Sequence, residues 1–215
     1  MRIIKPGYEI MTDISPYATL ELEAIERAAR TCYKSEGKIL DQGESAKKMI
    51  KKLIEHGHEA MLEHSSLTVK FICDRGVSHE LVRHRMASFA QESTRYCNYS
   101  KDQFGREITV IEPFFLKPGD AGWGVWMSAM DQAEDAYFHL LENGYSPQEA
   151  RCVLPNSLKT EVVVTANYRE WRHILKLRCA NDAHPQIREI MVPLLKELHE
   201  RIPVVFDDIY ENRRD

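Results

Sequence analysis

Apolar residues recur along much of the chain at the spacing of an amphipathic helix. Over residues 20–33, Leu22, Ile25 and Ala29 fall three or four positions apart, so they share one helix face. Residues 45–56 repeat this pattern. The same spacing predicts further helices over residues 77–86, 123–143, 169–177 and 185–200, and Pro147 is suited to begin a helix that carries Arg151.

A second pattern, the alternation of apolar and polar residues, predicts strands. Residues 65–73 alternate in this way, as expected for a half-buried strand. Short β-branched or apolar runs predict two more strands, over residues 162–166 and 108–111. The polar stretch between residues 86 and 108 predicts an irregular loop. Together these patterns predict a mixed α+β fold that is rich in helix.

The composition indicates one substantial core and narrows the function. The chain has 215 residues, 43% hydrophobic and 29% charged, so we expect a single domain over 1–215. The formal net charge of -4 argues against a general nucleic-acid binder, which needs a broad basic surface. No apolar run approaches the ~18 residues that cross a bilayer, and the first residues lack the pattern of a signal peptide. We therefore expect no membrane partner and a soluble, cytoplasmic protein.

The five cysteines are scattered along the chain without a CxxC pair. This spacing favours reduced thiols over a disulfide or zinc framework. We therefore expect the cysteines to be small core residues rather than nucleophiles.

Polar and charged side chains are concentrated between residues 83 and 96, where three arginines, one histidine and three Ser or Thr hydroxyls fall within fourteen residues. Only Glu80 and Glu92 lie near enough along the chain to neutralise this cluster, so a purely structural role would leave charge uncompensated. The planar fork of arginine suits phosphate, and hydroxyl groups can add donors. The cluster therefore predicts a phosphorylated ligand.

The helix predicted just before the cluster sets the directions of its side chains. On this helix Val77, Leu81 and Val82 are expected to face inward, whereas Arg83 and Arg85 point about 200° apart. The two arginines could therefore serve two different ligands.

Other candidate residues are isolated along the chain. Arg151 lies in an apolar run and Arg178 near a predicted helix end, where a snorkelling or ion-paired arginine is common. Arg169 and His173 are four positions apart and share a helix face, so they can bind one ligand together. The histidines and glutamates of residues 56–64 match neither HExxH nor a zinc-finger spacing, so we expect no metal.

A set of short motifs then follows one order along the chain. Arg83-His84-Arg85, seven further residues and Ser93 form an RHRx7S pattern. Other matching blocks are His56-Gly57-His58-Glu59, Glu63-His64-Ser65, Ser78-His79-Glu80-Leu81-Val82-Arg83, Ser93-Thr94-Arg95-Tyr96, Ala150-Arg151-Cys152-Val153-Leu154-Pro155, Asn167-Tyr168-Arg169 and Leu175-Lys176-Leu177-Arg178. From about residue 14 to about residue 202 the chain resembles the flavin-dependent thymidylate synthase (ThyX) family.

The resemblance implies a homotetramer of α+β subunits with mixed helices, an antiparallel sheet and active sites at subunit interfaces. It implies FAD as cofactor, dUMP as substrate, and NADPH and 5,10-methylenetetrahydrofolate as co-substrates. The FAD contacts that it implies are Arg83, His84, Arg85, Gln91, Asn167, Tyr168, Arg169, His173 and Ala60. The dUMP contacts that it implies are Glu80, Leu81, Val82, Arg83, Gln91, Glu92, Ser93, Thr94, Arg95, Arg151 and Arg178.

The reaction implied by the resemblance is reductive methylation of dUMP to dTMP in de novo dTTP biosynthesis. The family needs no enzyme nucleophile, because reduced flavin delivers hydride to the pyrimidine. The residue types agree, since Arg95, Ser93 and Arg151 suit a dianionic phosphate. Arg178 suits negative charge that develops on the ring, which makes it our candidate catalytic residue.

Two segments depart from the family pattern. Ala60 stands where many relatives carry Ser or Thr, so any FAD contact there must come from its backbone. Residues 97–119 match no family block, and long loops of this kind often shape access for a second substrate. The residues that bind folate and NADPH are therefore not assigned.

Two other hypotheses remain open from the sequence. A non-catalytic nucleotide or RNA-binding module would use Tyr96, Tyr99 and Phe104 as stacking surfaces beside the basic cluster. A flavoprotein of the same fold could instead act on another uridylate or use another one-carbon donor.

Overall fold

The structure of the chain is a computed structural model that describes residues 1–40 and 43–213. Its strands are β1 (Arg2–Ile4), β2 (Gly7–Ile10), β3 (Ser66–Asp74), β4 (Ala87–Gln91), β5 (Thr109–Ile111) and β6 (Lys159–Asn167). Its α-helices are α1 (Thr19–Tyr33), α2 (Glu44–Glu55), α3 (Arg75–Leu81), α4 (Ala121–Glu142), α5 (Pro147–Ala150), α6 (Tyr168–Arg178), α7 (Pro185–Arg201) and α8 (Pro203–Glu211). Short 3₁₀ helices are η1 (Pro16–Ala18), η2 (Glu36–Lys38), η4 (Glu59–His64), η5 (Asp102–Phe104) and η6 (Arg151–Val153).

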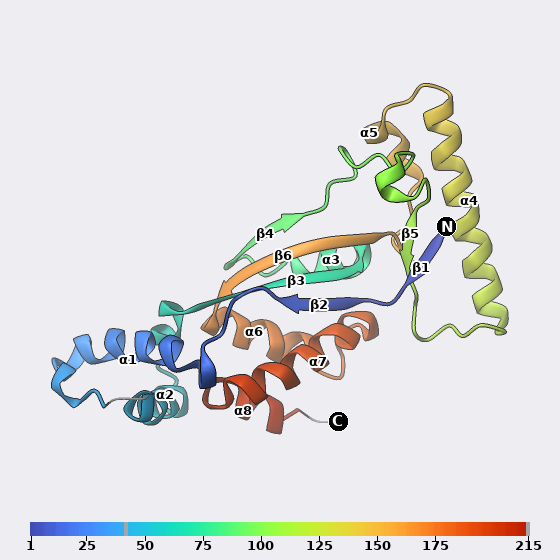
Figure 1. Ribbon diagram of the computed structural model, residues 1–215. Coiled ribbons are helices and arrows are strands. Elements are labelled where there is room, and N and C mark those ends of the chain that lie inside the picture. Colours follow the sequence, from blue (N-terminus) through green and yellow to red (C-terminus); the bar gives the residue numbers. More distant parts are fainter. Residues whose placement is uncertain (41–42, 214–215) are drawn as a thin grey trace. The chain divides into compact units, whose positions relative to one another are not determined.

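The strands form two sheets (Figure 1). One sheet has the order β2-β3-β6-β4, and the other is the pair β1 and β5. The pair is parallel, with Arg2 opposite Thr109 and Ile4 opposite Ile111. This combination of helices with an antiparallel sheet confirms the α+β class.

The chain forms two compact units. The first unit comprises Met1–Gly7, Phe71–Arg83 and Ala90–Val163. The second comprises Tyr8–Lys70, His84–Phe89 and Val164–Asp215. Strands β3 and β6 each contribute residues to both units. The single domain over 1–215 therefore stays a prediction.

The core of the first unit lies between α4 and β5, which Figure 1 shows beside one another. Met130 and Tyr137 of α4 pack with Ile108, Val110 and Leu158, all of them buried. Part of the segment 97–119 belongs to this core, because Ile108 and Val110 are fully buried. The segment is therefore not simply an exposed loop.

The second unit is organised around α6. Asn167 begins this helix as its N-cap, with its side-chain oxygen accepting a hydrogen bond from Glu170 N at 2.8 Å. One face of α6 is buried, where the ring of Trp171 donates from Nε1 to Leu67 O at 2.9 Å. The opposite face carries the exposed residues Arg169 and His173.

A buried arginine ties α6 to its neighbours. The side chain of Arg172 is 1% exposed and donates to both carboxylate oxygens of Asp208, at 2.7 and 2.8 Å. It also donates to Glu59 Oε1 at 3.1 Å and to the carbonyl of Val205. Burial opposes the charged state, but the bonds to Asp208 and Glu59 raise the pKa of Arg172. This one cation therefore links η4, α6 and α8.

Most predicted elements agree with the structure, but the region around the arginine-rich motif does not. The helix predicted over 77–86 ends at Leu81, and residues 87–91 form β4 where a loop was predicted. Strand β4 lies beside β6, and Glu92 N donates to Glu161 O at 2.9 Å just beyond it. Val82 is 39% exposed, so the prediction that it faces inward was wrong.

Other differences are smaller. The short helix α5 ends at Ala150, so Arg151 begins the 3₁₀ helix η6 instead of continuing an α-helix. Strands β1 and β2 and helix α8 were not predicted, since each is a short apolar run beside a proline or glycine. No α-helix in the described residues combines the length and apolar character required to span a membrane.

The buried cation makes a prediction about stability. Arg172→Ala should lower the free energy of unfolding by roughly 3–5 kcal/mol, because Glu59 and Asp208 lose their shared cation. Arg201→Ala removes an exposed pair with Glu197 and should cost less than about 1 kcal/mol. Urea unfolding monitored by circular dichroism measures both changes. Equal losses for the two variants would show that Arg172 does not have this role.

Candidate active site

The arginine-rich motif, residues 83–96, begins in a turn between α3 and β4 that holds Arg83, His84 and Arg85. Within it His84 is only 4% exposed, whereas Arg83 and Arg85 on either side are exposed. Because the helix has ended before this point, the helical angle predicted between the two arginines does not apply. The turn instead buries its histidine and leaves both arginines accessible.

His84 is held by two groups of α6. Its Nε2 accepts a hydrogen bond from Arg178 Nε at 3.0 Å, and its Nδ1 lies 3.7 Å from Glu170 Oε1. The ring of His173 meets it edge-on, with 5.7 Å between ring centroids. The fold thus joins His84 and Arg178, two predicted site residues that lie 94 positions apart.

The surroundings of His84 keep it neutral. Burial, followed by the charges of Arg178 and His173, lowers its pKa from 6.5 to about 4. Burial also raises the pKa of Glu170, against the effect of His173. A neutral imidazole can accept from a guanidinium, which only donates. The contact with Arg178 therefore agrees with the lowered pKa of His84.

One group of side chains has the spacing of metal ligands. One ligand atom each of His84, Glu170 and His173 lies within 4.8 Å of the others. A metal needs a free lone pair on an imidazole nitrogen. The Nε2 lone pair of His84 already accepts from Arg178, and a neutral ring then carries its proton on Nδ1. The geometry of His84 therefore disfavours a metal, and the assignment of no metal stays a prediction.

Three residues of the predicted cofactor set line one pocket of about 460 Å³ in the second unit. We call it the Arg169 pocket. Arg169 donates from Nη1 to Glu63 Oε1 at 2.6 Å, and both side chains are about half exposed. Exposed pairs of this kind contribute little stability, so an anionic ligand can replace Glu63 at Arg169. The pocket is lined by Glu59, Glu63, Met86, Asn167, Arg169, Glu170, His173 and Lys176.

A second pocket of about 460 Å³ lies in the first unit, and we call it the Arg151 pocket. Arg151 donates from Nη1 to Thr94 Oγ1 at 3.4 Å. Arg75 lines the same pocket, and its buried Nη1 has no hydrogen-bond partner among the described residues. Two guanidinium groups beside a hydroxyl form a chemistry that suits phosphate. The full lining is Arg75, Thr94, Gln148, Arg151, Cys152, Leu154, Pro155 and Asn156.

Gln91 and Glu92 are fixed by polar contacts within the first unit. Gln91 donates from Nε2 to Ser78 Oγ at 3.0 Å and to Thr160 Oγ1 at 3.2 Å. Glu92 accepts from Lys159 Nζ at 3.0 Å, so its carboxylate is paired with this lysine. Glu92 is one of the two carboxylates near the arginine cluster in the sequence, and its pairing with Lys159 was not predicted.

These two residues also line a pocket of about 420 Å³ with Cys97 and Phe104 from the unassigned segment 97–119. The segment thus lies beside predicted substrate residues. This placement favours the prediction that it shapes access to them, although the folate and NADPH contacts stay unassigned.

The end of the motif is accessible. Arg95 and Tyr96 are exposed, and the Arg95 guanidinium lies 5.4 Å from the centre of the Tyr96 ring. The Ser93 hydroxyl accepts from Arg95 N at 3.3 Å. In the described part of the chain no histidine or carboxylate bonds to this hydroxyl. The arrangement favours a binding role for Ser93 over a nucleophilic one.

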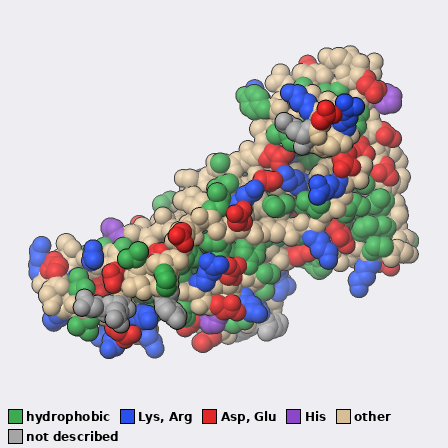
Figure 2. Space-filling model, in the orientation of Figure 1, with side chains coloured by type: hydrophobic (Ala, Val, Ile, Leu, Met, Phe, Trp, Pro, Cys, Tyr) green, Lys and Arg blue, Asp and Glu red, His purple; other side chains and the backbone are tan. Residues whose placement is uncertain are grey.

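The surface gives little support to the RNA-binding hypothesis. Tyr99 is 5% exposed and packs against Phe104 and Tyr137, so it is not available for base stacking. On the face in view in Figure 2, Lys and Arg side chains alternate with Asp and Glu. This face therefore lacks the broad basic surface that such binding needs.

Some predicted contacts lie in the core. Leu81 is 2% exposed, and Tyr168 is fully buried with its ring edge-on to Phe206. Their side chains pack the protein interior and do not face either pocket. Ala60 is exposed on η4, between Glu59 and Glu63 of the Arg169 pocket, and Glu80 is half-buried on α3.

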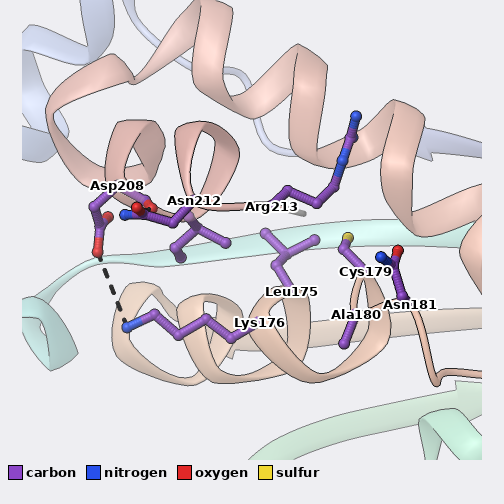
Figure 3. A pocket seen from close by; sticks show the side chains of 9 residues that line it. Leu175, Lys176, Cys179, Ala180, Asn181, Asp208, Asn212 and Arg213 are labelled. Carbon is purple, nitrogen blue, oxygen red and sulfur yellow. Dashed lines mark hydrogen bonds and ion pairs between the residues drawn. The ribbon is translucent and has the colours of Figure 1, made fainter. Parts of the chain in front are cut away.

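A further pocket of about 530 Å³ lies between α6 and α8 (Figure 3). Leu175 and Ile209 contribute apolar surface, and Lys176 and Asp208 approach to 4.0 Å at one end. Cys179 also lines it, but burial raises the pKa of this thiol to about 12, so it is not a reactive nucleophile. None of the predicted contact residues lines this pocket.

Glu170 and Arg75 are among the pocket residues that were missed in the sequence. Glu170 follows the N-cap Asn167 by three positions, which is the usual position of a capping glutamate, and this hid its contact with His84. Arg75 follows Asp74, which caps α3 through Val77 N at 2.8 Å. Arg75 is a charged residue in the first turn of a helix that follows a buried strand, and this position could have indicated a binding role.

Comparison with known proteins gives consistent matches. Residues 17–204 match the family described as thymidylate synthase complementing protein. A flavin-dependent thymidylate synthase of Geobacter sulfurreducens is 35% identical over 192 residues, covering 86% of this chain and 80% of the relative. One from Corynebacterium aurimucosum is 34% identical over 202 residues, covering 86% of this chain and 79% of the relative.

A solved structure shares the fold. It is the UMP/dUMP methylase PolB from Streptomyces cacaoi bound with 5-Br dUMP. The TM-score is 0.76 at 24% sequence identity, and the match covers 99% of this chain and 98% of the other. At this identity the similarity establishes the fold alone.

The neutral state of His84 predicts a stability that is sensitive to acid. Its folded pKa of about 4 lies below the model value of 6.5, so the unfolded chain binds more protons between these values. The contribution of His84 is complete above the unfolded pKa and is lost as the pH falls towards the folded one. From about pH 7.5 to about pH 5 the original protein should lose about 2 kcal/mol more than His84→Gln. Urea unfolding at both pH values tests this, and parallel losses would contradict it.

Proposed function

Because the chain belongs to the family of flavin-dependent thymidylate synthases, we propose that it methylates dUMP reductively to dTMP with FAD as its cofactor. NADPH is the proposed reductant and 5,10-methylenetetrahydrofolate the proposed carbon donor. The observation that carries the proposal is the contact of Arg178 Nε with His84 Nε2 at 3.0 Å. It joins the arginine-rich motif to the residue proposed to activate the substrate.

The Arg169 pocket fits the chemistry of FAD. Arg169 and Lys176 supply cations for a pyrophosphate, and Met86 supplies apolar surface for a ring system. Asn167 and His173 line the same pocket, which supports both as cofactor contacts. When bound, the flavin supplies the redox chemistry that carries hydride to the pyrimidine.

The Arg151 pocket is the proposed site of the dUMP phosphate. Arg151 and Thr94 are already in contact at 3.4 Å, and Arg75 adds a second guanidinium. Ser93 and Arg95 flank Thr94 in the motif and are proposed as further donors. The positive charge would hold the phosphate dianion and so orient the nucleotide.

Arg178 is the proposed catalytic residue. A guanidinium is always protonated, so it can stabilise negative charge on the pyrimidine without giving up a proton. The hydrogen bond to His84 limits the directions in which this group can point. Preorganisation of this kind is how an enzyme stabilises developing charge.

The cysteines support a reaction without an enzyme nucleophile. Burial raises the pKa of the Cys73 thiol to about 12, with a further increase from Asp74. Burial likewise raises the pKa values of Cys179 and Cys97. These thiols stay protonated near neutral pH, so they are poor nucleophiles.

We further propose that the active form is a homotetramer whose sites combine residues of several chains. Arg83, Arg85 and Arg95 are exposed in the single chain. Met86 is 71% exposed and Tyr96 78% exposed in the same motif. Accessible cations beside large apolar side chains suit a site that other subunits complete.

The proposal predicts both flavin binding and product formation. FAD should remain with the purified protein through gel filtration, and NADPH should bleach its visible absorbance without oxygen. Addition of dUMP and methylenetetrahydrofolate should then yield dTMP, measured by chromatography. Arg178→Ala should keep FAD while lowering kcat by about 10²–10³.

The possible outcomes of this assay are distinct. Product from UMP but not from dUMP would reject the proposed substrate and favour the altered-substrate hypothesis. Failure to retain FAD would reject the cofactor. Unchanged kcat in Arg178→Ala would reject its catalytic role.

The placement of Arg75 makes a separate prediction. Arg75→Ala should raise KM for dUMP by about tenfold, because a charged hydrogen bond contributes about 1.5–3 kcal/mol. It should leave inhibition by deoxyuridine, which has no phosphate, unchanged. Arg106→Ala, which removes an exposed pair with Asp102, is the matched control and should alter neither. An equal loss of dUMP and deoxyuridine binding would contradict a phosphate contact.

A further inference from the structure

The contact between Arg178 and His84 imposes a proton arrangement on the imidazole. Arg178 Nε can only donate, so His84 Nε2 must be the acceptor in their 3.0 Å contact. A neutral imidazole has one protonated nitrogen, so the proton must lie on Nδ1. Only this tautomer of the neutral ring is compatible with the bond to Arg178.

Glu170 is the group that faces the protonated nitrogen. Its Oε1 lies 3.7 Å from His84 Nδ1, and its side chain is 12% exposed. At this distance the contact is electrostatic, and a carboxylate stabilises an N–H dipole that points towards it. The alternative tautomer would direct a lone pair at the carboxylate and an N–H at Arg178. Both changes are unfavourable in a buried site.

The backbone holds Glu170 in this place. Its amide donates to Asn167 Oδ1 at 2.8 Å, the capping bond that begins α6. Glu170 and Arg178 therefore lie at opposite ends of one helix, and His84 contacts both. The helix fixes the spacing between the two groups that surround the imidazole.

The other charged groups nearby do not supply this function. His173 meets the imidazole edge-on and, when charged, would repel a second proton. Glu63 is paired with Arg169, and Glu59 with Arg172. Arg83 and Arg85 flank His84 in the chain and are exposed. Among the described residues, Glu170 is the carboxylate with an ion-pair contact to His84.

We propose that Glu170 is a positioning residue, which holds His84 in its Nδ1-protonated tautomer so that Nε2 keeps Arg178 oriented for catalysis. The orientation of Arg178 for catalysis rests on the proposed function, in which Arg178 stabilises charge on the substrate. The tautomer of His84 does not depend on the proposed function. Glu170 also lines the Arg169 pocket, but in this proposal its effect on catalysis passes through His84.

The first test is the protonation state of His84 in the resting protein. ¹⁵N-histidine labelling with two-dimensional NMR near neutral pH distinguishes protonated from acceptor nitrogens, and the signal lost in His84→Gln identifies the residue. In the original protein Nδ1 should be protonated and Nε2 an acceptor. An Nε2-protonated or doubly protonated ring would overturn the proposal, even if no Glu170 variant folds.

The second test replaces the carboxylate. Glu170→Gln keeps a carbonyl oxygen that can accept from Nδ1, so it should retain the tautomer. Glu170→Ala should produce a mixture of the two tautomers. Glu63→Ala removes a different carboxylate from the same pocket and should leave the His84 signals unchanged. An unchanged tautomer in Glu170→Ala would overturn the proposal.

Kinetics separate positioning from a general loss of structure. Glu170→Ala should lower kcat by about 10–100-fold, the usual effect of losing a group that orients a ligand-contacting residue. KM for dUMP should change by less than about threefold, and Glu170→Gln should recover most of kcat. A rise in KM with kcat unchanged would contradict the proposal.

Zinc gives a final test, because a metal would need a deprotonated Nδ1 or Nε2 on His84. Stoichiometric Zn²⁺ binding that is lost in both His84→Gln and Glu170→Ala would overturn the proposal in favour of a metal site. No such binding would support it. If the tautomer changes as expected but the original protein forms no dTMP, Glu170 still positions Arg178 and only the proposed reaction fails.

Discussion

The buried guanidinium of Arg172 is the contact on which the second unit depends. It is surrounded by Asp208, Glu59 and a backbone carbonyl, so it joins three helical segments at one point. A buried cation is costly unless every donor finds an acceptor, and this requirement makes the arrangement specific. The orientation of α6 follows from it. The opposite face of the same helix therefore presents Arg169 and His173 to a ligand in a defined direction.

Helix α6 both packs in the core and carries residues of the candidate active site. Its buried residues alternate with accessible ones at the helical period, so the same rigid rod packs the core and lines the Arg169 pocket. The helix then ends at Arg178, where the side chain meets His84. Sites built on rigid elements hold their geometry better than sites on loops. Arg83, His84 and Arg85 lie in a turn instead, and there the His84 side chain is buried.

Burial changes the chemical character of several groups along the chain. It keeps His84 neutral at physiological pH, which permits the contact with Arg178. It also keeps the Cys73 and Cys179 thiols protonated, so they are poor nucleophiles. Lys159 shows the opposite effect, since burial opposes its charge but its bonds to Glu161 and Glu92 raise its pKa. Desolvation and pairing, rather than residue type alone, decide what each side chain can do.

The sequence by itself determined the family, the α+β class and most helices, because periodicity and ordered motifs are local properties of the chain. It also predicted His84 and Arg178 as site residues. Only the tertiary structure decided that the two meet, that Glu170 faces the imidazole, and that Arg75 lines the Arg151 pocket. The tertiary structure also decided that residues 87–91 form strand β4, because pairing with β6 overrides the local pattern that predicted a loop. Contacts between distant segments depend on packing and burial, which no local pattern encodes.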